Sequence, residues 1–144
     1  MDVPKYRELK VWQKAHKVAL DIIELLKDVP NQPGLNRIVD QIVGSASSVG
    51  ANIAEGSSSR RGKEYIRYLE IALRSATECD NWIQVVKDSQ EIKKFVDLHK
   101  LQEIEFMNIE VLKMLIKMIE SLEKKREEEG LGSTIREIVE DYLP

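Results

Sequence analysis

The sequence predicts an all-α protein: an up-down-up-down antiparallel four-helix bundle with a short C-terminal tail helix. Four long stretches place apolar residues every three or four positions, which is the spacing of one helix face. Short polar segments connect these stretches, and no strand-like alternation of useful length occurs. Amphipathic helices with short connections pack as antiparallel neighbours. The 144 residues fit one domain, which we assign to residues 1–130, followed by a tail at 131–144.

The first two helices are separated by a clear stop signal. Apolar residues recur at helical spacing over residues 11–29, and the proline- and glycine-containing segment 30–34 ends this helix. A second pattern covers residues 35–53, and Gly56 stands where a left-handed cap residue is expected. Residues 57–62 are polar and predict a short connection.

The boundary between the last two helices is predicted from capping residues and from helix length. The third pattern covers residues 65–86, and the capping-box spacing of Asp88 and Glu91 predicts a new helix start there. One unbroken helix over 91–128 would be about 57 Å long, against about 30 Å for the second helix. We therefore expect either a break near Asp97–Leu98 or an end that projects beyond the bundle.

The tail carries its own helix signal. Thr134 and Glu137 have capping spacing ahead of a short run of apolar residues at helical intervals. This pattern predicts a short amphipathic tail helix over residues 134–143. If the protein is an adaptor or a structural ring, this helix is expected to dock on neighbouring copies or on a partner.

Composition sets limits on the class of protein. The chain has 22 basic and 25 acidic residues, and the net charge of −3 argues neither for nor against nucleic-acid binding. Cys79 is the single cysteine, so no intramolecular disulfide framework or thiolate metal cluster is expected. The N-terminus lacks the features of a signal peptide, and no apolar run has the length of a membrane span. We expect a cytoplasmic protein that does not enter a membrane.

Residues 41–54 contain no charged residue in a chain that is 33% charged. Such a window would occur by chance in roughly 0.4% of cases if charges were scattered at the chain's own frequency. One side of this helix carries the apolar core stripe, and the opposite side carries small residues. Two interpretations remain: this helix is the most buried member of its own bundle, or its back face contacts another subunit. The residues assigned to a subunit interface or structural signature are Gly44, Ser48, Ala51, Asn52, Glu55 and Gly56.

Two polar residues near the end of this segment need partners. A buried Asn52 amide must be hydrogen-bonded, and we expect a structural bond to a neighbouring helix end. Glu55 lies in the last turn, where the helix dipole disfavours a carboxylate, so a basic partner is expected. Arg60 and Arg61 are the nearest candidates.

The third helix carries a possible nucleic-acid contact surface. Basic residues lie opposite its apolar stripe and could approach phosphates together. The candidate contact residues are Arg60, Arg61, Lys63, Arg67 and Arg74. However, Glu70 and Glu78 lie at ion-pair spacing from Arg74, so a self-neutralised solvent face is the alternative.

Residues able to support catalysis are not grouped in the sequence. His16 and His99 are isolated and belong to no metal-ligand pattern, while Cys79 falls on an apolar face and is expected to be a core thiol. Trp12 and Trp82 border apolar stripes, which favours packing over base stacking. We expect a protein that is not an enzyme, with no catalytic, cofactor-binding or metal-binding residues, no cofactor and no small-molecule substrate.

The sequence resembles a known family in three segments. These are the uncharged block Ser-Val-Gly-Ala-Asn-Ile-Ala-Glu-Gly at 48–56 with the arginine pair that follows, the segment 63–78, and the opening at 9–15. Together they resemble the four-helix-bundle proteins encoded in 23S rRNA intervening sequences, over about residues 6–122. That family includes accessory proteins of diversity-generating retroelements, which work beside a reverse transcriptase.

The resemblance implies a ring-shaped homopentamer with a non-enzymatic role. Its partners would be copies of itself, and RNA or an RNA-handling protein of the reverse-transcriptase type. The alternative function is a protein–protein adaptor or a structural ring that binds no nucleic acid.

Overall fold

A computed structural model describes residues 3–59 and 62–129, and within them the chain is helical. The elements are η1 Lys5–Glu8, α1 Lys10–Leu25, α2 Pro33–Ser57, α3 Gly62–Asp88, α4 Gln90–Lys93 and α5 Leu98–Glu128. The predicted tail helix at 134–143 and the boundary near residue 130 lie outside the described residues.

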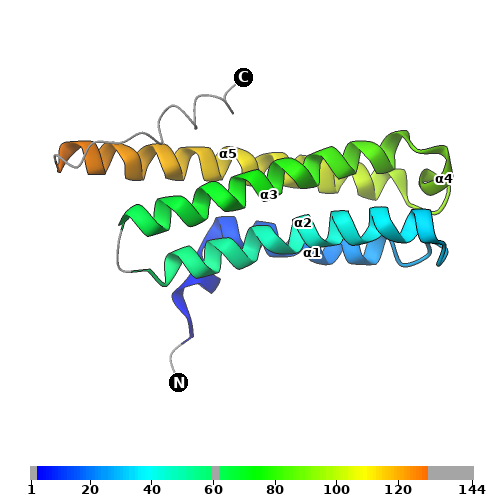
Figure 1. The fold of residues 1–144 in the computed structure, drawn as a ribbon, viewed down its shortest axis with the longest axis horizontal. Coiled ribbons are helices and arrows are strands. Elements are labelled where there is room, and N and C mark those ends of the chain that lie inside the picture. The colour runs from blue at the N-terminus through cyan, green and yellow to red at the C-terminus, as the bar shows by residue number, and fades with distance from the viewer. Residues whose placement is uncertain (1–2, 60–61, 130–144) are drawn as a thin grey trace.

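The four long helices form the predicted bundle (Figure 1). Successive long helices run antiparallel, and the packed pairs are α1–α2, α2–α3, α3–α5 and α1–α5, which closes the bundle. The short η1 helix packs against α1 and α2. Among the described residues, no helix combines the length and apolar character that crossing a membrane requires.

The apolar core is divided into two clusters along the bundle axis. One cluster includes Val11, Val49 and Ile119, and the other includes Ile22 and Ile83. Every long helix contributes to both, because each runs the length of the bundle. Two buried polar residues, Asn108 on α5 and Ser45 on α2, lie close to the level where the clusters meet.

Asn108 satisfies its amide across the bundle. Its side chain is 1% exposed, and Nδ2 donates to the carbonyl oxygen of Ala76 on α3 at 3.0 Å. Since a buried amide without partners is costly, a shift of α5 along α3 that broke this bond would be unfavourable.

The connection from α3 to α5 contains the predicted break. Ser89 caps α4, its hydroxyl accepting from the backbone N–H of Ile92 at 3.3 Å, so the helix start lies one residue after the predicted Asp88. Asp97 caps α5 and accepts from the backbone N–H groups of His99 at 2.9 Å and Lys100 at 3.2 Å. The last turns of α5 also extend past the beginning of α3 (Figure 1), so the chain shows both the break and the projecting end.

The prediction of a left-handed cap at Gly56 is wrong. Helix α2 continues to Ser57, and Gly56 is buried inside its last turn. A Cβ atom at Gly56 would lie 2.8 Å from Cβ of Tyr68 and 3.0 Å from Cδ2 of Tyr65. Glycine is therefore required here because α3 approaches α2 closely, rather than because the backbone turns.

Candidate functional site

The residues of the uncharged segment 41–54 fall mainly into three sets with different surroundings. Its apolar residues face the core, as the sequence predicts. A second set faces α3, and a third set remains exposed to solvent. We call the third set the α2 strip, and its members are Gln41, Gly44, Ser47 and Ala51.

The side of α2 that faces α3 carries a small hydrogen-bond network. Nδ2 of Asn52 donates to the backbone oxygen of Ser48 at 2.8 Å and to its hydroxyl at 3.0 Å. The Ser75 hydroxyl on α3 donates to the same Ser48 hydroxyl at 3.0 Å. The expected bond from Asn52 to a neighbouring helix end is thus replaced by a bond within α2, because the carbonyl four residues earlier lies within reach of a short amide side chain.

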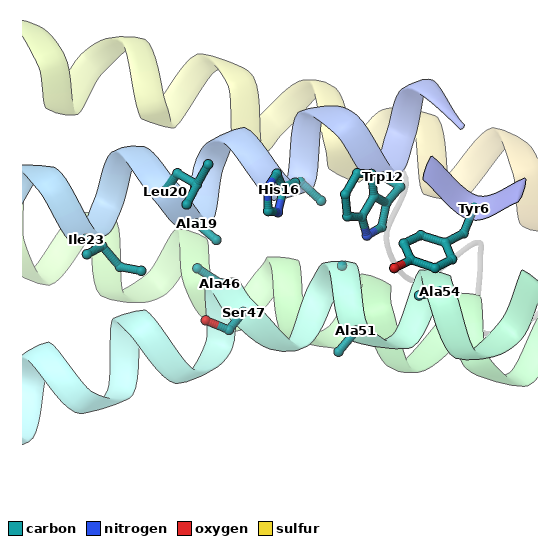
Figure 2. A pocket seen from close by; sticks show the side chains of 12 residues that line it. Tyr6, Trp12, His16, Ala19, Leu20, Ile23, Ala46, Ser47, Ala51 and Ala54 are labelled. Atoms are coloured by element: carbon teal, nitrogen blue, oxygen red, sulfur yellow. The ribbon is translucent and has the colours of Figure 1, made fainter. Parts of the chain in front are cut away.

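A groove separates α1 from α2 on the other side of the strip (Figure 2). Its volume is about 330 Å³. The wall from η1 and α1 carries larger side chains, and the wall from α2 carries small ones. The lining residues are Tyr6, Trp12, Ala15, His16, Ala19, Leu20, Ile23, Ala46, Ser47, Gly50, Ala51 and Ala54. Leu20 and Ile23 are 53% and 51% exposed, so this wall of the groove presents neighbouring large apolar side chains to solvent.

Three aromatic rings stand in a row along one end of this groove (Figure 2). The Tyr6 ring meets the Trp12 ring edge-on, with centroids 5.1 Å apart and planes at 70°. The His16 ring stacks on Trp12 with centroids 4.7 Å apart and planes at 13°. Trp12 also packs against the core, as predicted, and a Cβ at Gly50 would lie 3.4 Å from its Nε1. We call these three rings the aromatic row.

The predicted basic surface on α3 is partly neutralised. Lys63, Arg67 and Arg74 are exposed, but Arg74 forms an ion pair with Glu70, as their i,i+4 spacing predicts. The Arg67 guanidinium lies over the ring of Tyr68, 4.9 Å from its centroid.

Two further ion pairs were expected near this surface. One does not form among the described residues, and the other involves residues outside them. Glu78 accepts a hydrogen bond from Nε1 of Trp82 at 3.3 Å, and no ion pair of Arg74 with Glu78 occurs among the described residues. Glu55 is exposed, and its expected partners Arg60 and Arg61 lie outside the described residues.

Cys79 is a buried core thiol on α3, as its position on the apolar face predicts. Burial raises the pKa of this thiol to about 12, and a hydrogen bond with Ser45 offsets part of the rise. Over the part of the chain that the structure describes, no group of three or more His, Cys, Asp or Glu side chains could hold a metal ion.

Besides Ser45, two buried polar residues were not predicted from the sequence. Asn108 lies in the fourth apolar stripe, where a single polar residue gives little signal. Glu123 is 3% exposed, and neither carboxylate oxygen has a hydrogen-bond partner among the described residues. Glu123 lies four residues after Ile119 and so continues the buried stripe of α5. The sequence gives no sign of this burial, because Glu123 begins a run of charged residues.

The fold and these surfaces define a four-helix-bundle protein whose distinctive features, over the described residues, are the α1–α2 groove and the α2 strip. Residues 7–117 match the family of 23S rRNA-intervening sequence proteins, and the chain belongs to that family. Among solved structures it is similar to a protein of unknown function from the S23 ribosomal protein family of Bacteroides thetaiotaomicron VPI-5482. The two share 28% identity with a TM-score of 0.66, over 76% of this chain and 97% of the other. No functionally curated protein matches the chain.

Proposed function

We propose that this protein is a non-enzymatic, self-associating helical bundle that acts together with RNA or an RNA-handling protein such as a reverse transcriptase. The α2 strip is the surface through which copies contact one another. The observation that carries the proposal is that this strip is exposed in the single chain and yet bears no charge.

An exposed helix face normally carries charged side chains. The outward face of α5 does so, with Lys113, Lys117 and Lys124 all exposed. Apart from Gln41 the α2 strip instead has small residues, and at Gly44 an added Cβ would meet no atom within 4 Å. Small side chains let another backbone approach closely, and the exposed Leu20 and Ile23 beside the strip add apolar area to such a contact.

The contact is tested by placing a charge on the strip. Ser48 is hydrogen-bonded inside the chain, so Ser47 and Ala51 are the better positions. We expect Ser47→Lys and Ala51→Lys to reduce the mass measured by native mass spectrometry or light scattering, because a lysine would be desolvated in the contact. Ser121→Lys, on the exposed face of α5, is the matched control and should leave the mass unchanged. A wild-type monomer, or oligomers of unchanged mass in both strip variants, would contradict the proposal.

The RNA part of the proposal is supported by the exposed cations of α3, chiefly Lys63 and Arg67. Binding to phosphates should weaken as salt increases. The alternative, an adaptor or structural ring without nucleic acid, is favoured by the neutralisation of Arg74 by Glu70. Absence of RNA binding even at low salt would select that alternative.

A further inference from the structure

The strongest local concentration of positive charge lies at the start of the chain. Residues 5–17 contain five basic residues and one acidic residue, Glu8, in a protein whose net charge is −3. This segment forms η1 and the first half of α1. It is separate from the α3 surface considered above.

Ion pairs within the bundle neutralise only part of this charge. Nζ of Lys14 lies 2.5 Å from a carboxylate oxygen of Glu110, and Nζ of Lys17 lies 2.9 Å from Asp21. The remaining basic residues, Lys5, Arg7 and Lys10, are exposed and form no ion pair with any residue of 3–59 or 62–129.

The aromatic row lies in the same segment as these cations. Arg7 lies over the Tyr6 ring, 5.9 Å from its centroid, so positive charge and aromatic surface adjoin directly. His16 is exposed at the other end of the row, where the groove continues past Ala19. On the opposite wall the residues beside the rings are small, and Gly50 and Ala54 among them lie outside the α2 strip (Figure 2).

We propose that η1 and the first half of α1 form a binding surface for single-stranded RNA. Lys5, Arg7 and Lys10 contact the phosphates, and an unpaired base stacks on the aromatic row beside His16. Arg7 beside Tyr6 places a cation next to an aromatic ring, while Lys10, about 160° around α1 from Trp12, extends the positive charge to the far side of the helix. Cations together with stacking rings are the combination that single-stranded nucleic acids require. This inference rests on the proposed RNA association and names its contact surface.

A second protein copy fits this end of the groove less well than RNA. Protein interfaces are depleted in lysine at their centre, because a lysine that loses its water there needs a paired carboxylate. Arg7, which lies over Tyr6 at this end, has no such partner in the described chain, whereas a phosphate would compensate its charge.

Removing the charges tests the phosphate contacts. The probe is a fluorescein-labelled single-stranded RNA of mixed sequence, with binding followed by fluorescence anisotropy over a salt series. We expect the triple variant Lys5→Gln, Arg7→Gln, Lys10→Gln to bind at least tenfold more weakly at low salt. The slope of log K against log salt should fall by about 2, given about 0.7 for each phosphate contact to a single strand. The matched control Lys113→Gln, Lys117→Gln, Lys124→Gln on α5 should bind as the wild type does.

The stacking contact has its own readout. Trp82→Phe leaves Trp12 as the only tryptophan of the chain. We expect RNA to quench the Trp12 fluorescence with the same midpoint as the anisotropy change. In this background His16→Ala should weaken binding about tenfold, since loss of a stacking ring has an effect of that order. A double-stranded RNA of the same sequence should quench less, because its bases are paired.

The outcomes separate this inference from the proposed function. If Lys63→Gln with Arg67→Gln abolishes binding while the N-terminal triple variant binds normally, RNA association stands and this surface is excluded. Binding without any change in Trp12 fluorescence excludes the stacking contact. If the wild type binds no RNA at low salt, both this inference and the RNA part of the proposed function are wrong.

Discussion

At the scale of single residues, two glycines on α2 have opposite surroundings. Gly56 is covered by Tyr65 and Tyr68, while Gly44 is open. We expect Gly56→Ala to reduce the free energy of unfolding by about 2 kcal/mol, as overpacking of a tight contact does. Gly44→Ala should raise it by about 0.5 kcal/mol, because alanine favours the helix. Urea unfolding of both variants measures the difference, and equal effects would contradict the close approach of α3.

The Cys79 thiol gives a second prediction at this scale. The pKa of the Cys79 thiol is raised from 9.0 to about 12 in the folded protein, so the thiol of the unfolded chain ionises first as the pH rises. The free energy of unfolding therefore decreases as the pH rises through this interval. At pH 8 we expect iodoacetamide to label Cys79 only when urea unfolds the chain. In a Cys79→Ser background, Ser121→Cys on the exposed face of α5 provides a thiol that should be labelled at once without urea. Rapid labelling of Cys79 in native buffer would show that the thiol is accessible.

Sequence reasoning identified several important residues without identifying their contacts. The Glu70–Arg74 pair follows from spacing alone, because both residues lie on one helix. The roles of Gly56 and Asn52 depend on how close α3 comes and on which carbonyl lies within reach, and a helical wheel contains neither distance.

At the scale of helices, apolar periodicity predicted the bundle because each stripe must be buried against another helix. The break near Asp97 was one of two alternatives that followed from the length of the fourth apolar pattern, while the Asp97 cap itself was not predicted. The α1–α2 groove was not predictable, since its walls come from residues as far apart as Tyr6 and Ala54. Its existence depends on the side-chain sizes that meet when the two helices pack.

The end of α5 provides a prediction about one helix. Glu123 is buried in the core register without a hydrogen-bond partner among the described residues. We expect Glu123→Leu to raise the free energy of unfolding by about 2 kcal/mol, because it removes a desolvated polar group. Glu120→Leu, at an exposed position one turn earlier, should change stability by less than about 0.5 kcal/mol. A loss of stability in Glu123→Leu would mean that the carboxylate has a partner in solution.

At the scale of the whole molecule, the division of the core predicts two regions that open separately. Ile119 belongs to one cluster and Ile83 to the other. We expect Ile119→Ala to speed amide hydrogen exchange mainly around its own cluster, and Ile83→Ala to give the opposite pattern. Hydrogen exchange with mass spectrometry measures both. Uniform acceleration along all helices in either variant would indicate one cooperative core.

The position of Asn108 between the clusters has a consequence for how related sequences diverge. A change of side-chain volume in one cluster leaves a cavity that only the neighbours in that cluster can fill. The Asn108 amide bond to Ala76 holds α3 and α5 in register while such changes accumulate. Compensating core substitutions among family members should therefore pair within one half of the bundle, with the asparagine between them retained.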